Sequence, residues 1–220
     1  MLCYAQLMPR PRIHDLDDLL DAAERVAVES GPAAVTVRAL SEATGVSNGA
    51  IYHAFGSRAG LLGRTWLRAA RRFLEMQRRA VDQALPMSPS SDQAVEAVVA
   101  AADTPAEFLL QHAASGRFLL TVSRQELLGA NEIPDDIAEE LRRLDESLTE
   151  LFVVLARGVY GRGDREAVAV VRDCVVELPT ALLLRGRRDP EPAVRQRLAA
   201  AVRAVLAQPL GDSSIEKRER

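Results

Sequence analysis

Residues 47–55, SNGAIYHAF, carry the side chains with the clearest capacity for chemistry on a partner. An asparagine amide can form two hydrogen bonds with the edge of an adenine, and an alanine methyl group can contact the methyl group of a thymine. Asn48 and Ala50 supply these two groups. Small residues at Gly49 and Ala50 also let the backbone approach a partner closely. The segment therefore has the residue types needed to contact base edges in the major groove of DNA.

Two short helices around a tight turn would hold these side chains in place. Thr36 has the side-chain oxygen that caps a helix N-terminus. Helical spacing then relates the inward residues Val37, Leu40 and Thr44. Gly45 tolerates a positive φ angle, so it ends the first helix, and Ser47 can cap the second.

The second helix, Asn48 to Phe55, has distinct inner and outer faces. Ile51 and Phe55 lie four residues apart, so they share one side of the helix and face the core. Gly56 ends this helix, and Ser57 can cap a third one. The outward residues are Ser47, Asn48, Ala50, Tyr52 and His53. Two helices joined at a large angle by a short turn that contains glycine form a helix-turn-helix unit.

This segment resembles the N-terminal DNA-binding domain of the TetR family of bacterial transcriptional regulators. The matching residues keep the order and spacing of the family: Thr36, Arg38, Gly45, Val46, Ser47, Gly49, Ile51, Tyr52, Phe55, Ser57, Leu61 and Leu62. The resemblance extends over residues 16–73 and departs from the family at Ser41, Thr44, Ala54 and Arg58. Arginine in place of the usual lysine at position 58 keeps the positive charge with a different geometry.

The resemblance implies roles for individual residues on double-stranded DNA. Arg38 would reach a base edge or a phosphate, and arginine on guanine is the commonest specific contact. The residues expected to contact the sugar-phosphate backbone are Thr36, Ser47, Tyr52, His53 and Arg58. With Asn48, Gly49 and Ala50, they complete the predicted DNA-binding set. Simpler roles stay open, since Thr36 and Ser47 can act only as caps, Tyr52 can lie at the rim of the core, and His53 can be merely exposed.

The resemblance also implies a pocket for a small-molecule effector among the middle helices. In the family, ligand binding shifts the fourth helix and so the spacing of the two DNA-reading units. The candidate effector-binding residues are Trp66, Phe73, Phe108, His112, Phe118, Arg124 and Phe152. Ordinary core packing is the alternative for the aromatic residues. His112 and Arg124 are polar groups in apolar stripes, which predicts specific partners such as Glu107 or Glu126.

The rest of the pattern predicts an all-α fold of about ten helices. Helix-forming segments are expected near residues 15–30, 58–84, 92–102, 105–115, 117–128, 133–160, 164–185 and 190–207. Thr104 and Pro105 predict a new helix, because proline is favoured at the first helical position. Pro179 predicts a bend. The predicted domains are a flexible extension (1–12), a helix-turn-helix domain (13–57), a ligand-binding and dimerisation domain linked through helix 58–84 (58–208), and a flexible tail (209–220).

The last two helices, residues 164–185 and 190–207, predict a homodimer. The first is apolar on most sides, and the second carries the stripe Val194, Leu198, Val202 and Val205. A two-fold dimer reads two half-sites, whereas one recognition helix reads only a few base pairs. The family resemblance implies the same interface. The alternative is that both helices are buried within a single chain.

The charge of the chain is unevenly distributed. The net charge is −3, yet residues 31–80 contain eight arginines and only two acids, Glu42 and Glu75, which gives that segment a charge of +6. A basic region in an otherwise acidic protein is typical of an electrostatic DNA footprint. Arg10 and Arg12 can form an arm that touches DNA. Alternatively, the arginines beyond Arg68 form only the solvated face of a long helix.

Other features narrow the class of protein. No stretch of about 18 uncharged apolar residues occurs, so no membrane span is expected and a cytoplasmic location is predicted. The apolar start, MLCYAQLM, is too short for a secretory signal, and Met8 is an alternative start to Met1. Cys3 and Cys174 are too few for a disulfide framework.

No catalytic or metal-binding pattern stands out. The histidines at 14, 53 and 112 lack metal-ligand spacing, and GRGD at 161–164 resembles a turn because no strand precedes it. We therefore predict no cofactor, no metal and no enzymatic activity. The predicted function is a ligand-responsive repressor that binds a pseudo-palindromic operator as a dimer and is released by a small molecule. The alternatives are a helical module that binds only protein and an unrecognised small-molecule enzyme.

Overall fold

The computed structural model of the chain describes residues 14–85, 90–128, 133–185 and 190–211. Over these residues the chain is helical, and none of them lies in a β-strand. The α-helices are α1 (His14–Ser30), α2 (Val37–Thr44), α3 (Asn48–Phe55), α4 (Arg58–Ala84), α5 (Ser91–Gln111), α6 (Ala113–Thr121), α7 (Arg124–Leu128), α8 (Asp135–Tyr160), α9 (Arg165–Arg172) and α10 (Pro192–Leu206). The predicted all-α class is confirmed.

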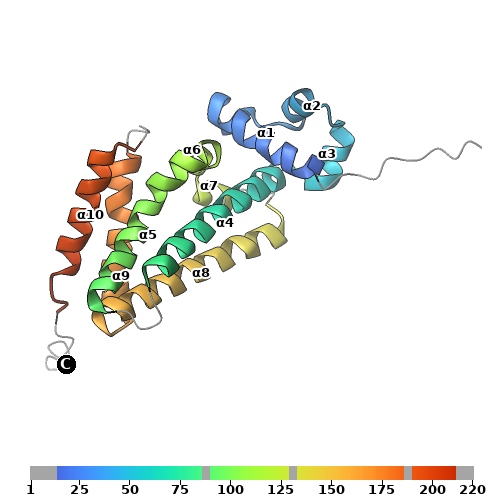
Figure 1. The fold of residues 1–220 in the computed structure, drawn as a ribbon. Coiled ribbons are helices and arrows are strands. Elements are labelled where there is room, and N and C mark those ends of the chain that lie inside the picture. Colours follow the sequence, from blue (N-terminus) through green and yellow to red (C-terminus); the bar gives the residue numbers. More distant parts are fainter. Residues whose placement is uncertain (1–13, 86–89, 129–132, 186–189, 212–220) are drawn as a thin grey trace, which may run out of the picture.

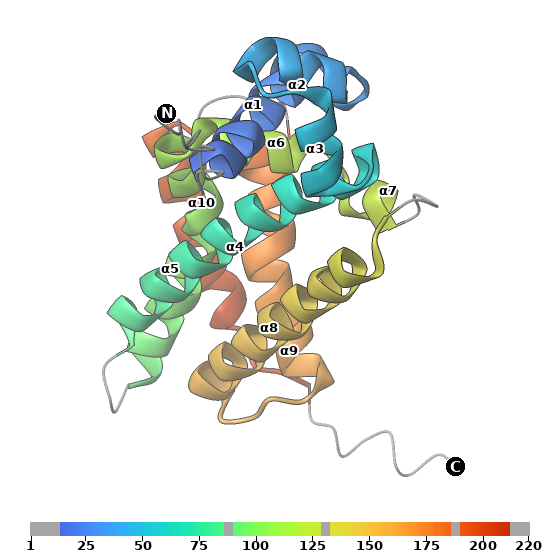
Figure 2. The same ribbon diagram turned by 90° about the vertical axis from the view of Figure 1, so that its right-hand side faces the viewer.

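The helices fall into a small N-terminal cluster and a larger bundle. In Figure 1, α1, α2 and α3 lie at one end of the molecule and α10 at the other, and the long helices α4 and α8 run between them. In the view of Figure 2, α4 lies between α5 and α8, and it contacts both. Helix α4 therefore extends from the N-terminal cluster into the bundle.

Two main hydrophobic cores correspond to these two parts. The first joins α1, α2, α3 and the start of α4 with residues of α6 and α7, among them Phe118 and Leu127. The second joins the rest of α4 with α5, α8, α9 and α10. Leu61 and Ala69 of α4 belong to the first core, and Leu74 and Val81 belong to the second. A shift of α4 would therefore be felt in both cores, because both pack against the same rigid helix.

The predicted break before Pro105 is wrong. Helix α5 continues through Pro105 instead of ending near residue 102. Proline has no N–H group, so it cannot bond the carbonyl of Ala101 four residues earlier. The side chain of Gln77 on α4 supplies the missing donor, since its Nε2 donates to the Ala101 carbonyl oxygen at 3.1 Å. A bond from a neighbouring helix thus compensates for the proline.

Pro179 affects its helix in another way. The sequence predicted a bend there; the structure has π-helical turns at Asp173–Glu177 and Thr180–Leu184, on either side of Pro179. Upstream, Asp164 caps α9 as predicted, with Oδ1 accepting from the backbone N–H groups of Glu166 and Ala167 at 3.1 and 3.2 Å. π-Helical turns are rare and often lie at functional sites.

Several boundaries differ from the predicted ones. The segment predicted as one helix, 117–128, is divided between two helices. Helix α6 ends at Thr121, and α7 begins at Arg124. Helix α10 starts at Pro192 after the N-cap residue Glu191. The described residues do not include 1–13, and the predictions for Cys3, Met8, Arg10 and Arg12 therefore lie outside them. Most of the predicted tail also lies outside the described residues. No helix in the described ranges is long and apolar enough to cross a membrane.

Candidate nucleic-acid interface and effector cavity

The helix-turn-helix forms as the sequence predicts. The Oγ1 atom of Thr36 accepts from Ala39 N at 3.1 Å, and the Oγ atom of Ser47 accepts from Ala50 N at 3.3 Å. Between the two helices Gly45 has a φ angle of 75°, in the left-handed region that favours glycine. Gly56 ends α3 with a φ angle of 69°. The predicted caps and turns are thus confirmed, and they fix the direction of α3.

Helix α3 has the inner and outer faces expected of a recognition helix. Ile51 and Phe55 are buried in the first core. Gly49 is exposed, and so are all the predicted outward residues: Ser47, Asn48, Ala50, Tyr52 and His53. Tyr52 is 57% exposed, too open for a rim residue of the core. Six of the nine residues predicted to touch DNA therefore lie together on α3 and its N-cap, whereas Thr36, Arg38 and Arg58 belong to α2, its N-cap and the start of α4.

Neither the packing nor the backbone conformation of the protein requires glycine at position 49. A Cβ atom built at this position has no neighbouring atom within 4 Å, and the φ angle of Gly49 is not among the positive ones. Glycine in a helix destabilises it relative to alanine. Neither packing nor backbone conformation explains the choice, so the space over Gly49 is open to a molecule outside the chain.

Arg38 extends from α2 into solvent next to an acid. Its side chain is 84% exposed, and its Nε lies 2.9 Å from Oε1 of Glu42, one turn further along α2. The hydrogen bond and the charge of Glu42 raise the pKa of the Arg38 guanidinium above its ordinary value. Arg38 is therefore charged and accessible, and Glu42 would compete with DNA for its guanidinium group.

Arg58 has a structural role beside its predicted DNA contact. Its Nε donates to the Val35 carbonyl oxygen at 2.8 Å, and its Nη2 donates to the carbonyl oxygen of Pro32. These bonds tie the start of α4 to the 3₁₀ turn Pro32–Ala34 that precedes α2. Arg58 remains exposed, but two of its three nitrogen atoms are used within the protein.

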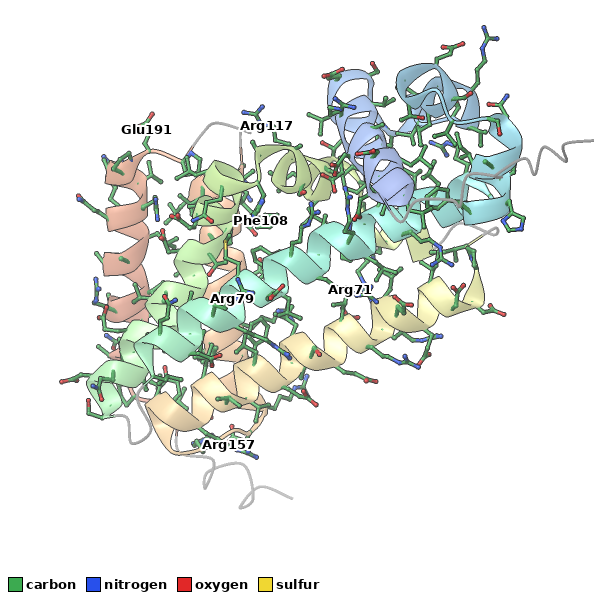
Figure 3. The ribbon with its side chains drawn as sticks, turned by 45° about the vertical axis from the view of Figure 1, so that its right-hand side comes forward. Arg71, Arg79, Phe108, Arg117, Arg157 and Glu191 are labelled. Carbon is green, nitrogen blue, oxygen red and sulfur yellow. The ribbon has the colours of Figure 1, made fainter. Side chains whose placement is uncertain are left out.

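The +6 charge of residues 31–80 is not a free basic surface. Acids from other parts of the fold neutralise several arginines of α4: Arg64 pairs with Asp136, and Arg71 with Glu140, both on α8. Figure 3 shows Arg71 on α4 beside α8. Arg79 pairs with Glu75 of its own helix. Beyond Arg68, Arg71 and Arg78 thus bond α8, and Arg79 bonds an acid of α4 itself. This pairing reduces the free positive charge along the later part of α4.

A buried polar link joins the helix-turn-helix to the bundle. Arg68 of α4 donates through Nη2 to Oε1 of Glu24 on α1 at 2.9 Å, and it also pairs with Asp17 and Asp21. The other carboxylate oxygen of Glu24, Oε2, accepts from the hydroxyl of Ser115 on α6 at 2.8 Å. Glu24 is only 2% exposed. Buried charges are retained only when they are paired and hydrogen-bonded.

A cavity of about 250 Å³ lies inside the bundle. Its walls come from α4, α5, α6, α8 and the π-helical segment after α9. The wall includes Phe73, Phe108 and Phe152, and the rings of Phe73 and Phe108 meet edge to face with centroids 5.5 Å apart. Figure 3 labels Phe108 on α5, within the bundle. Apolar concave sites with a few polar groups are typical ligand-binding sites.

Only part of the predicted effector set lines this cavity. Phe73, Phe108 and Phe152 do so, whereas Trp66, His112, Phe118 and Arg124 are not among its lining residues. Trp66 donates from Nε1 to the Val122 carbonyl oxygen at 3.1 Å. Phe118 is fully buried in the first core.

The polar candidates differ most from their prediction. His112 is exposed at the end of α5 and lies against the ring of Phe108, with ring centroids 5.2 Å apart, instead of in an apolar stripe. Arg124 pairs with Asp145 of α8, whereas Glu107, one of the predicted partners, pairs with Arg195. The side chain of Glu126, the other predicted partner, lies outside the described part of the structure. The reason is geometric, since the long-range partner on α8 cannot be inferred from spacing along α7.

Three residues of the cavity wall and the buried link were absent from the predicted set: Gln77, Glu24 and Ser115. Gln77 lines the cavity and is 1% exposed. Its position was detectable, because it lies four residues after Phe73 on the apolar face of α4. Glu24 likewise lies next to Ala23 on the inner face of α1, but its partner Ser115 is 91 residues away and carries no such signal.

The comparisons with known proteins agree with this geometry. Residues 19–65 match the family model for bacterial regulatory proteins of the TetR family. No curated protein sequence matches the chain significantly. Among solved structures, a TetR family transcriptional regulator, PfmR from Thermus thermophilus, is 21% identical with a TM-score of 0.58 and covers 86% of this chain and 96% of its own. A TetR family regulatory protein from Rhodococcus RHA1 is 18% identical with a TM-score of 0.65, covering 91% and 100%.

The fold by itself does not define the activity. A structure described as superantigen PfiT is 17% identical to the chain with a TM-score of 0.66, covering 91% and 100%. The matched N-terminal domain and the exposed α3 together define the class of protein, which is the helix-turn-helix transcription regulators. Residues 19–65 thus match the TetR family model, and the described chain has the fold of that family's regulators.

Proposed function

We propose that the protein is a repressor that binds a pseudo-palindromic DNA operator as a homodimer and is released by a small-molecule effector. The observation that carries the proposal is the exposed face of α3, with Asn48, Ala50 and Tyr52 accessible on a helix that two caps and two glycine turns orient. On this proposal, Asn48, Ala50 and Arg38 contact bases. Thr36, Ser47, Tyr52, His53 and Arg58 contact the DNA backbone, and Gly49 admits it closely. The protein would act in the cytoplasm.

The far end of the bundle supports dimer formation. Helix α10 is held to α5 on one side, where Arg203 forms a bidentate pair with Glu96 at 2.6 and 2.7 Å. Its other side exposes Ala193, Ala200 and Ala204. Leu182, in the segment before α10, is 44% exposed. Helices with small exposed residues can approach a symmetry mate closely, and a two-fold axis here would pair the two DNA-reading units.

The cavity supports regulation by a ligand. Gly116 and Leu119 of α6 line it, and α6 also carries Ser115, whose hydroxyl bonds Glu24 of α1. A molecule that displaces α6 would therefore disturb α1 and the helix-turn-helix through a hydrogen bond and not only through packing. Ligands shift such an equilibrium by their difference in affinity for the two states.

Sequencing of DNA selected from a random pool by the purified protein tests the proposal. We expect an enriched sequence with two-fold symmetry and a binding affinity that falls steeply with salt. Arg38→Ala and Tyr52→Ala should each weaken binding to that DNA, Arg38→Ala by about 1–3 kcal/mol if it reaches a base. Arg142→Ala, an exposed arginine on α8, is the control.

The outcome separates the remaining classes. Unchanged affinity in both variants would show that α3 and its neighbour α2 are not the DNA-binding surface. Selection of no DNA at all would favour a helical module that binds only protein. Sedimentation measurements on the same preparation report the oligomeric state, and a monomer bound to a single half-site would refute the dimer.

A further inference from the structure

The cavity is almost uniformly apolar, and Gln77 is the exception within its interior. Apart from Gln77, the lining residues are apolar side chains, Gly116, and Thr180, which is exposed. The Oε1 atom of Gln77 is buried and has no hydrogen-bond partner among the described residues. A buried polar atom without a partner costs about 1–3 kcal/mol. An acceptor is therefore held, at some cost, in the wall of an apolar cavity.

The orientation of the Gln77 amide is fixed by its neighbour. The nitrogen and oxygen of a glutamine amide are distinguished by their hydrogen bonds. Nε2 must face the Ala101 carbonyl oxygen, 3.1 Å away, because that oxygen cannot accept from Pro105. A flipped amide would place two acceptors against each other. Oε1 is consequently the atom left for another donor.

The size and charge of the site restrict what can enter. An apolar cavity of about 150 Å³ accommodates benzene, so a cavity of this size suits a molecule of roughly ten non-hydrogen atoms. No charged side chain of the described residues lines the cavity. A charged ligand would lose its hydration without a partner of opposite charge, which is strongly unfavourable.

We propose that the cavity binds an uncharged, mainly apolar molecule, of roughly ten non-hydrogen atoms, that carries a hydroxyl or N–H group and donates it to Oε1 of Gln77. The site would distinguish donors from acceptors, because a ligand oxygen without hydrogen would meet Oε1 as a second acceptor. The molecule's role as an effector rests on the proposed function. Its binding to the cavity does not.

Three naphthalene derivatives test the inference on the full-length protein by isothermal titration calorimetry at neutral pH. 2-Naphthol has the donor, 2-methoxynaphthalene keeps the oxygen without a donor, and 2-naphthoate is charged. We expect 2-naphthol to bind about three to ten times more tightly than 2-methoxynaphthalene, as one neutral hydrogen bond allows, and 2-naphthoate to bind most weakly. Equal affinity for the first two compounds, or tightest binding of 2-naphthoate, would overturn the proposal.

Two variants locate the effect. Gln77→Leu should remove the preference for 2-naphthol over 2-methoxynaphthalene while both still bind. The ratio of the two affinities is the readout, because the loss of the Ala101 bond affects both ligands alike. Leu120→Trp, on the α6 wall, should abolish binding of both. A preference that survives Gln77→Leu would contradict the assignment, and if that variant does not fold, the wild-type ligand series still decides.

The experiment is independent of DNA binding. It is done without DNA, so failure to select an operator leaves the ligand series interpretable. Conversely, absence of ligand discrimination leaves the helix-turn-helix proposal intact. Addition of 2-naphthol to the protein bound to its selected DNA then reports whether occupation of the cavity and release are connected.

Discussion

Removal of the Ser115 hydroxyl should destabilise the protein far more than removal of a hydroxyl from the exposed surface of a helix. Ser115 is buried and bonds Oε2 of Glu24 at 2.8 Å, and Glu24 itself is 2% exposed. The described residues offer Oε2 no other hydrogen-bond partner. A hydrogen bond to a charged group is worth about 1.5–3 kcal/mol. Since Arg68 still compensates the charge through Oε1, we expect Ser115→Ala to lower the free energy of unfolding by about 2 kcal/mol.

Urea unfolding followed by circular dichroism measures this loss, with a matched control on the same helix. The hydroxyl of Thr121 bonds only the carbonyl oxygen of Arg117 in its own helix, at 2.8 Å. Thr121→Ala should therefore change the free energy of unfolding by no more than about 0.5 kcal/mol. If Ser115→Ala is no more destabilising than Thr121→Ala, the link between α1 and α6 does not have the energetic weight that its burial indicates.

A double-mutant cycle isolates the pair itself. Ser115→Ala and Glu24→Leu, alone and combined, should be non-additive by about 0.5–3 kcal/mol, because each substitution removes the one hydrogen bond that the two residues share. Additive effects would mean that each substitution acts through its own surroundings. The same variants serve in the DNA assay, where a weakened link predicts a weaker response of DNA affinity to a bound ligand.

Four further predictions concern other parts of the fold. Gly49→Ala should raise the free energy of unfolding by about 0.5 kcal/mol, since the added methyl group meets no atom. The same variant should bind the selected DNA more weakly. If both the stability and the DNA affinity rise, DNA does not approach Gly49. Glu42→Gln should strengthen DNA binding and make it depend more steeply on salt, because the substitution removes a negative charge and the ion-pair partner that lies 2.9 Å from Arg38. Unchanged affinity would mean that Arg38 does not contact the DNA. The hydrogen bond from Arg203 lowers the pKa of Glu96 below its ordinary value of 4.5. The ion pair therefore stabilises the fold above pH 4.5, and this stabilisation is lost as the pH falls further. The free energy of unfolding of Arg203→Gln should depend less on pH below 4.5 than that of the wild type. Burial raises the pKa of the Cys174 thiol to about 12, so iodoacetamide at pH 8 should modify Cys174 only after denaturation, as mass spectrometry would show.

Local signals in the sequence account for most of the helix-turn-helix. Capping oxygens at Thr36 and Ser47 and glycines at Gly45 and Gly56 act within a few residues, so their effects can be predicted without the fold. The outward face of α3 follows from the spacing of its buried residues in the same way. The Arg38–Glu42 pair was foreseeable too, because residues four apart are neighbours on the surface of a helix.

Long-range pairing explains where the sequence-based reasoning failed. Pro105 was predicted to start a helix because the rule for proline is local, and the donor that permits a continuous α5 comes from Gln77, 24 residues before Ala101. The charge of residues 31–80 was summed along the chain, whereas Arg64 and Arg71 meet their acids on α8, about 70 residues away. Such partners are set by how helices pack, and one chain without its fold does not reveal them.

The short distance along α6 between the cavity and the helix-turn-helix gives the strongest argument for regulation within this chain. Gly116 lines the cavity, and the preceding residue, Ser115, bonds Glu24 of α1. A Cβ atom at Gly116 would come within 2.8 Å of Leu109, so α6 is packed tightly against α5 and has little room to adjust locally. Consecutive residues of a helix move together, so a ligand that displaces Gly116 must also strain the Ser115 bond. The two sites are then connected through one rigid helix, and the Ser115→Ala variant breaks that connection without touching either site.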